Sequence, residues 1–338
     1  MENYVEVQFE ELDKTVLYRG NSYIRKNLSD SLEITKQHIK IIFSRSKKIK
    51  YREILESENS LIRYQLQKAL CFYLITQGTF PEVRRVLIFD GLEIHDVSDM
   101  LFVKNMEGCN LDICLTPDIA STIFKDERYS KNFYVAITYM IKAQIDAFSN
   151  DCFRAAWSGV NSIFNCLKRL SELDNGIRES DLLNRLERLI QSLEMKEAIH
   201  EIEDLSEDFY KKLDWYNYTQ KYGDEIEPNK IKDTLMLRYL VKHYKIKNKE
   251  DKKEKQLFEK AKKYSNKNVT DYNSRLCMLV CKYCYMLRNR MFHGVKAYPV
   301  FIVSEKAELT VERKLTRVML TTMCDLITKM VIDSRGGA

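Results

Sequence analysis

The sequence predicts a mainly α-helical protein, with a smaller α or mixed α/β domain at its N-terminal end. The 338-residue chain contains only ten glycines and four prolines, and 45% of its residues are apolar. Apolar residues recur at helical spacing along most of the chain beyond residue 130, whereas β-branched and aromatic clusters occur before it. A chain of this length usually exceeds one compact core, so we expect two domains, residues 1–125 and 126–338.

The N-terminal domain mixes two kinds of sequence pattern. Residues 28–46 and 60–76 have helical spacing, and residues 79–103 and 110–118 are β-like. Ser29 and Ser60 are expected to cap the two helices, because a serine before the first apolar turn can accept a backbone hydrogen bond. The sequence leaves the role of this domain open between regulation and dimerisation.

The C-terminal domain is expected to be a bundle of amphipathic helices, each with an apolar face turned to the core. The predicted helices lie within residues 132–149, 152–173, 180–213, 231–247, 270–294 and 310–332. A very short turn joins the first two, and the third segment holds one or two helices. A short irregular or β-like piece around residues 295–304 separates the last two.

A Lys-rich insertion at residues 245–268 precedes the penultimate long helix. Residues 245–267 hold ten lysines and four acidic residues, so this stretch alone carries the +6 charge of the whole chain. Runs of this kind form solvated helices or mobile connections, and they can also bind a phosphate backbone. A smaller basic run, Arg45–Arg52, has the same two interpretations.

The nine cysteines form an odd, scattered set, which favours reduced thiols in a cytoplasmic protein over a disulfide framework. There is no run of about 18 apolar residues and no basic-then-apolar leader, so neither a membrane span nor secretion is expected. Cys277, Cys281 and Cys284 allow a zinc site with His293 as fourth ligand. Their spacing along one helix favours thiols in a packing face instead, and we expect no metal or other cofactor.

The stretch RNRMFHG, Arg288–Gly294, closes one of these predicted helices. The expected core stripe of that helix is Leu276, Val280, Tyr283, Leu287 and Met291. Arg288 borders the stripe, and Asn289 and His293 share one face. One interpretation is a helix C-terminus, with Gly294 in the left-handed conformation and basic residues stabilising the last turn. The other is a catalytic site.

The three polar side chains of this stretch suit the cleavage of a phosphodiester. An imidazole such as that of His293 moves a proton near neutral pH, and the guanidinium of Arg288 stabilises a charged transition state. Asn289 can orient the imidazole or the phosphate. No carboxylate cluster or glycine-rich phosphate loop accompanies them, which indicates chemistry without a metal. Such chemistry favours RNA, whose 2′-hydroxyl is a built-in nucleophile.

RNRMFHG resembles the Arg-(4–6 residues)-His motif of the HEPN superfamily, and the Asn after Arg and the Gly after His are common in its Apea-like branch. The resemblance covers roughly residues 130–335. It implies a HEPN-like helical bundle in the C-terminal half and a metal-independent endoribonuclease that leaves a 2′,3′-cyclic phosphate and a 5′-hydroxyl. It makes Arg288 and His293 the catalytic pair, with Asn289 as the supporting polar residue.

The resemblance also implies a biological setting and partners. HEPN ribonucleases act as toxins, in abortive infection and in anti-phage defence, so we expect a cytoplasmic effector of one of these kinds. The expected partners are RNA, a second copy of the chain that completes a composite site, and an antitoxin or regulatory protein. The residues expected to bind RNA are Lys252, Lys253, Lys255, Lys262, Lys263 and Arg290.

Three alternatives stay open. Arg238 and His243 also satisfy the loose Arg–His spacing, but they lack the Asn and the Gly and are expected to be surface residues. Residues 209–222 interleave aromatics with lysines, as base-stacking surfaces do, although core packing also explains them. A non-catalytic HEPN-like module that binds RNA or a nucleotide, or a helical adaptor protein, is the alternative to an enzyme.

Overall fold

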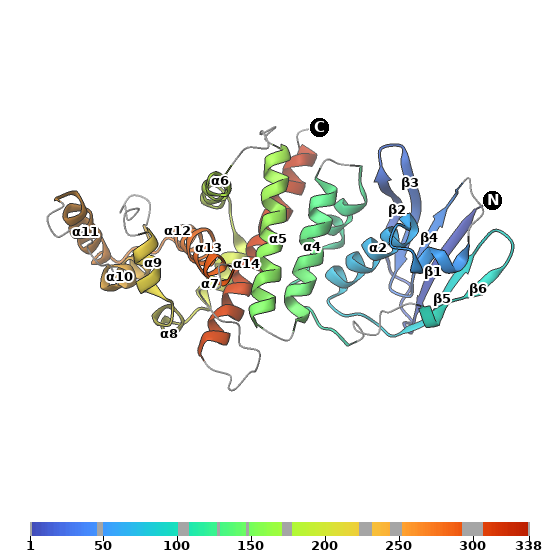
Figure 1. Ribbon diagram of the computed structural model, residues 1–338, viewed down its shortest axis with the longest axis horizontal. Helices are drawn as coiled ribbons and strands as arrows, with labels where there is room; N and C mark the ends of the chain where they lie inside the picture. Colours follow the sequence, from blue (N-terminus) through green and yellow to red (C-terminus); the bar gives the residue numbers. More distant parts are fainter. Residues whose placement is uncertain are drawn as a thin grey trace. The chain divides into compact units, whose positions relative to one another are not determined.

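The structure is a computed structural model that describes residues 2–45, 50–100, 108–126, 129–146, 149–170, 178–222, 232–243, 252–292 and 307–336. The chain is mostly helical, with a six-stranded antiparallel sheet towards its N-terminal end (Figure 1). The prediction of a mainly α chain with a mixed α/β N-terminal part is therefore confirmed.

The chain divides into two compact units, each assembled from separated stretches. Unit 1 comprises Met1–Ile145, Asn161–Glu172 and Ile327–Ala338, and unit 2 comprises Asp146–Val160 and Leu173–Leu326. Helices α5 (Ser149–Leu170) and α14 (Ala307–Gly336) each begin in unit 2 and end in unit 1. The expected boundary between residues 125 and 126 stays a prediction.

The sheet of unit 1 has the strand order β2-β3-β4-β1-β5-β6, with antiparallel neighbours throughout. Its strands are β1 (Asn3–Phe9), β2 (Val16–Arg25), β3 (Leu28–Thr35), β4 (His38–Phe43), β5 (Val83–Phe89) and β6 (Ile94–Asp96). In β1, the buried Val5, Val7 and Phe9 alternate with partly exposed residues. This alternation places one face of the strand on a core.

The prediction of a helix over residues 28–46 is wrong, because this segment forms β3 and β4. Ser29 lies within β3 and caps no helix. The buried side chains alternate along each strand, Leu32 and Ile34 in β3 and Ile39 and Ile41 in β4. The pair in β4 follows the pair in β3 by seven residues, and a spacing of seven residues also fits two turns of a helix. Because only a short turn separates the two strands, their buried residues taken together have the spacing expected of a helix.

The second predicted helix of the N-terminal part is confirmed as α2 (Leu61–Gln77), which contacts β2, β4 and α4. Ser60 is its N-cap, because the Ser60 side chain accepts a hydrogen bond from Arg63 N at 3.2 Å. The helix ends at Gly78, whose φ of 74° is left-handed. The remaining helical elements of unit 1 are α1 (Tyr51–Glu56), η1 (Ser98–Met100), α3 (Pro117–Ala120), η2 (Ser121–Phe124) and α4 (Ser130–Ile145).

The β-like prediction holds for one of its two segments. Residues 79–103 contain β5 and β6, as expected. Residues 110–118 form no strand, and only Asn110 makes an isolated bridge, to Thr79. The segment turns into α3 because Pro117 occupies the first helical turn and the Thr116 side chain accepts from Ile119 N.

Unit 2 consists of helices in the part of the chain that the structure describes. Besides the first part of α5 and of α14, they are α6 (Glu179–Ser192), α7 (Lys196–Glu203), α8 (Glu207–Lys211), α9 (Trp215–Tyr222), α10 (Thr234–His243), α11 (Lys252–Ser265), α12 (Tyr272–Cys277), the π-helical η4 (Met278–Cys284) and α13 (Tyr285–Phe292). The predicted helices over 132–149, 152–173 and 310–332 correspond to α4, α5 and α14.

Residues 180–213 form three helices, where one or two were expected. Extended backbone at Leu193 ends α6, and the Ser206 side chain caps α8 by accepting from Phe209 N. Residues 270–292 form the continuous series α12, η4 and α13, begun by the side chain of Asp271 as N-cap. The predicted irregular piece around residues 295–304 lies outside the described residues.

Candidate functional site

Arg288 lies on α13, at the edge of the buried surface of the helix series α12, η4 and α13. All five residues of the expected core stripe are buried, from Leu276 to Met291. The three cysteines of the neighbouring line are buried as well. The side chain of Arg288 keeps 22% of its surface exposed. It is therefore half-buried at the edge of the core, as its place beside the stripe predicts.

The guanidinium of Arg288 is held from several sides. Its Nη1 donates to Asn289 Oδ1 at 2.8 Å and lies 3.5 Å from Glu179 Oε2. The guanidinium carbon stands 4.8 Å from the centroid of the Phe292 ring. The Nε of Arg288 is buried and has no hydrogen-bond partner within the described part of the chain. Asn289 thus orients the guanidinium of Arg288, whereas the sequence led us to expect that it orients the imidazole of His293 or the phosphate.

His293 and Gly294 lie outside the described residues. The structure therefore places two of the three expected catalytic side chains, Arg288 and Asn289, in direct contact. The choice between a helix C-terminus and a proton-transfer role for His293 stays with experiment.

Two further cations stand around the aromatic rings near Arg288. The Arg154 guanidinium of α5 lies 5.4 Å from the Phe292 ring, and Lys221 Nζ of α9 lies 4.7 Å from the Tyr285 ring. Arg154 is also 4.0 Å from Asp151, and Tyr285 Oη is 3.5 Å from Glu179 Oε2. A set of cations gathered on aromatic faces suits an anionic ligand with planar bases.

Arg290, expected to bind RNA, forms an ion pair with Asp214. Asp214 also caps α9, accepting from Asn217 N at 3.1 Å and from Asn217 Nδ2 at 2.6 Å. Burial raises the pKa of Asp214, but these hydrogen bonds and Arg290 outweigh it and hold the pKa below its usual range. Arg290 therefore ties α13 to the start of α9, and a role in RNA binding remains a prediction.

The Lys-rich insertion contains α11, which has one buried and one solvated face. Ala261 and Ser265 are buried, and α11 packs against α10. The expected RNA-binding residues in this helix are Lys252, Lys253, Lys255, Lys262 and Lys263. Of these, Lys252, Lys255, Lys262 and Lys263 are exposed and span an arc of roughly 100° by helical geometry. The arc is compatible with both a solvated face and a phosphate contact.

The competing pair, Arg238 and His243, lies on α10. Arg238 Nε donates to the carbonyl of Ser265 at 3.2 Å, which caps the end of α11. The carbonyl of His243 accepts from Thr219 Oγ1 at 2.9 Å. Burial, together with neighbouring Lys242, lowers the pKa of His243. These contacts give Arg238 a structural role in joining α10 to α11.

Arg288 and its neighbours Glu179, Tyr285, Asn289 and Phe292 are called the Arg288 cluster below. A cavity of about 1010 Å³ lies in unit 2 beside this cluster. One face of α6, two tyrosines of α9, the start of α12 and part of η4 form its walls. Tyr285 belongs both to this wall and to the cluster, through its contact with Glu179. The cavity was not predicted from the sequence, and the interleaved aromatic residues and lysines of 209–222 were the one local indication of it.

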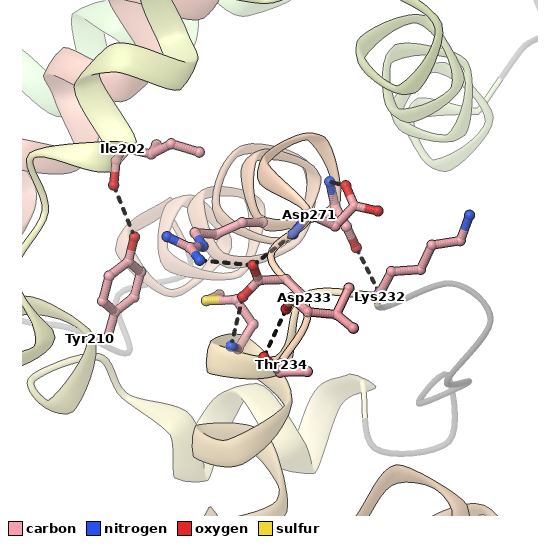
Figure 2. A network of polar contacts seen from close by, with 10 residues as sticks. Ile202, Tyr210, Lys232, Asp233, Thr234 and Asp271 are labelled. Atoms are coloured by element: carbon pink, nitrogen blue, oxygen red, sulfur yellow. Dashed lines mark hydrogen bonds and ion pairs between the residues drawn. The ribbon is translucent and has the colours of Figure 1, made fainter. Parts of the chain in front are cut away.

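Figure 2 shows a buried polar network around Asp233, which also includes Lys232 and Asp271 of the cavity wall. Asp233 is completely buried and its Oδ2 accepts from Arg275 Nη2 at 2.8 Å and from Asp271 N at 3.1 Å. Its Oδ1 accepts from Met236 N at 3.0 Å and so caps α10. Burial lowers the pKa of Arg275, but Asp233 more than compensates and raises it. The pair fixes the start of α10 to the start of α12, the series that carries Arg288.

The zinc alternative has no support among the described residues. They contain no group of three or more His, Cys, Asp and Glu side chains placed to hold a metal ion. A hydrogen bond with Cys281, together with burial, raises the pKa of the Cys277 thiol, and burial raises the pKa of Cys284. All three thiols are buried in a packing face, and His293, the fourth ligand of the zinc alternative, lies outside the described residues.

Within the described ranges, none of the helices has the length and apolar character that crossing a bilayer requires. Comparison of the chain with protein-family models, with curated proteins and with solved structures finds no match.

Proposed function

We propose that this chain is a metal-independent endoribonuclease of the HEPN type, with its site at the end of α13. The observation that carries the proposal is the state of Arg288. Its guanidinium is half-buried, oriented by Asn289 and Phe292, and keeps a buried Nε without a partner among the described residues. It also precedes His293 by five residues in RNRMFHG. A pre-oriented cation of this kind stabilises charge that develops in a transition state.

The proposed reaction uses the 2′-hydroxyl of RNA. A base, assigned to His293, takes the proton of the 2′-hydroxyl while the 2′-oxygen forms a bond to the adjacent phosphorus. The bond from phosphorus to the 5′-oxygen of the next nucleotide breaks, and that oxygen takes a proton from a general acid, which the second copy of the chain supplies. The products are a 2′,3′-cyclic phosphate and a 5′-hydroxyl. Arg288 stabilises the extra negative charge on the phosphorus oxygens during this exchange.

The charges around Arg288 support an RNA ligand. Arg154 and Lys221 add two cations near the Phe292 and Tyr285 rings, and Glu179 holds Arg288 only at 3.5 Å. An incoming phosphate can replace so long a contact with a shorter, charge-assisted bond. One arginine and one histidine offer few groups for both acid and base roles, so the proposal includes a second copy of the chain that completes the site.

Cleavage is expected to survive EDTA and to fail on a substrate with 2′-deoxyribose at the cleaved position. The reason is that the nucleophile belongs to the substrate. Purified protein is incubated with a structured RNA pool and EDTA, and the new ends are sequenced. Activity that disappears with EDTA and returns with magnesium would contradict the proposal, as would cleavage of the deoxy substrate.

Replacing Lys252, Lys255, Lys262 and Lys263, four of the exposed lysines of α11, with glutamine is expected to weaken binding of all RNA sequences alike. The dependence of affinity on salt should also flatten, by about 0.7 in slope for each phosphate of a single strand that the variant no longer neutralises. Binding is measured by fluorescence anisotropy at several salt concentrations. Lys196→Gln with Lys211→Gln, two exposed lysines elsewhere in unit 2, is the control and should change the slope less per charge removed. An unchanged slope in the α11 variant assigns this face to solvent.

A further inference from the structure

The cavity of unit 2 has the size and composition of a ligand site. Its volume of about 1010 Å³ lies at the upper end of the range for small-molecule sites, roughly 300–1,000 Å³. Aromatic rings line it at Tyr218 and Tyr222 of α9 and at Tyr285 of α13. Flat aromatic side chains of this kind stack on nucleobases without requiring one sequence.

One amide in the wall has an unused acceptor. Asn273 Nδ2 donates to the carbonyl of Leu193 at 3.3 Å, which fixes which way the amide faces. Its Oδ1 is buried and lacks a hydrogen-bond partner among the described residues. A buried acceptor without a partner is costly, and a ligand N–H removes that cost. Nucleobases carry amino and imino N–H groups on the edge that proteins recognise.

One of the three cations in the cavity wall, Lys282, belongs to an irregular helix, and the others are Arg188 and Lys232. Met278, Cys281 and Lys282 line the cavity from η4, which is π-helical along its whole length. π-Helical turns are rare and occur mostly at functional sites. Lys282 Nζ is 3.7 Å from Glu187 Oε2 and 5.7 Å from the Tyr222 ring. The ammonium is therefore close to an aromatic face and within reach of a phosphate attached to a base stacked there.

The cavity and the Arg288 cluster are adjacent along one helix series. Tyr285 lines the cavity, and Arg288 follows it by three residues, about one helical turn. A strand with one phosphate at Arg288 can thus place its neighbouring nucleotide against the tyrosines.

We propose that the cavity binds a nucleotide, with the base against Tyr218 and Tyr222, a base N–H on Asn273 Oδ1 and the phosphate at Lys282. In the enzyme this nucleotide is the one next to the cleaved bond, an assignment that rests on the proposed ribonuclease function. The cavity then sets which base is accepted beside the cut.

The test measures binding without cleavage. The probes are the four ribonucleoside 5′-monophosphates, inorganic phosphate, and a short oligonucleotide with 2′-deoxyribose throughout. Trp215 and Trp157 lie in ring contact with Tyr218 and Tyr285, so tryptophan fluorescence reports an occupied cavity, and calorimetry confirms the affinity. At least one monophosphate is expected to bind more tightly than phosphate alone.

Two variants and a control locate the binding. Lys282→Met should weaken binding of the monophosphate at least ten-fold, because the phosphate no longer has a charged hydrogen-bond donor there. Asn273→Leu should reduce the preference among the four bases. Lys211→Gln, on α8 and outside the cavity wall, should bind as the unchanged protein does. All variants are checked for an unchanged melting curve. Failure of every monophosphate to bind, or equal binding by the Lys282 and Lys211 variants, would overturn the proposal.

Competition distinguishes a nucleotide of the strand from a free nucleotide. Displacement of the deoxy oligonucleotide by the monophosphate supports the assignment to the substrate strand. A monophosphate that binds through Lys282 without displacing the oligonucleotide overturns that assignment and makes the cavity a site for a free nucleotide. These binding measurements do not depend on cleavage. If the protein binds a monophosphate but cuts no RNA in the EDTA experiment, the proposed ribonuclease function is contradicted, and the cavity still stands as a nucleotide site.

Discussion

Replacing Arg288 with alanine is expected to lower the rate of RNA cleavage by on the order of 10²-fold or more, the usual effect of removing a group that stabilises transition-state charge. RNA binding should weaken less, because Arg154 and Lys221 remain nearby. The rate is measured under single-turnover conditions with a sequence identified in the EDTA experiment. Some stability should also be lost, since the guanidinium packs on Phe292.

His293→Ala distinguishes the two interpretations of RNRMFHG. If His293 transfers the proton, cleavage falls by on the order of 10²-fold or more while the melting curve stays nearly unchanged. If His293 only stabilises the helix end, the substitution costs up to about 1 kcal/mol of stability, and activity falls only as folding does.

The pair on α10 supplies the internal control. Arg238→Ala and His243→Ala should cut RNA at the normal rate, although the first loses its bond to the Ser265 carbonyl. Loss of activity in these two variants, with activity retained after substitution of Arg288 and His293, would place the site on α10 and contradict the assignment to α13.

The second large effect concerns stability. Asp233→Asn is expected to destabilise unit 2 by about 3 kcal/mol or more, because it leaves the buried guanidinium of Arg275 without its counter-charge. The asparagine keeps one acceptor for Met236 N, so the weakening of the cap is limited. Both tryptophans of the chain, Trp157 and Trp215, belong to unit 2. Urea unfolding followed by tryptophan fluorescence therefore reports on unit 2.

A matched exposed pair tests whether burial is the reason. Asp208 pairs with Lys211 at 3.2 Å, but both side chains are more than half exposed. Asp208→Asn should leave the unfolding midpoint nearly unchanged, since exposed ion pairs contribute little. Equal destabilisation in the two variants would show that the buried Asp233–Arg275 pair stabilises the protein no more than an exposed ion pair does.

The parts of the fold that the sequence predicted are those with local signals. Ser60, Gly78 and the apolar face between them are close in sequence, and they mark both ends of α2. The stripe from Leu276 to Met291 placed Arg288 at the edge of the core in the same way. Residues 28–46 were misread because two short alternations at a seven-residue interval also fit a helix.

The parts that the sequence did not reveal depend on distant partners. Asp233 and Arg275 are 42 residues apart, and each alone is an ordinary surface type of residue. The cavity needs α6, α9 and η4 together, so no single segment announces it. Asn289 lies next to Arg288, yet its bond to the guanidinium depends on side-chain rotamers that spacing does not give.

Helices α5 and α14, which begin in unit 2 and end in unit 1, affect the order in which the chain can fold during its synthesis. Unit 1 includes the buried Ile327, Met330 and Val331 of α14, and Arg335 of that helix bonds Asp118 across 217 residues. Domains commonly fold in order as they leave the ribosome. Unit 1 is complete only after α14, the last described helix, has been made. We therefore expect unit 1 to reach its full stability late in synthesis, although most of its residues are made early.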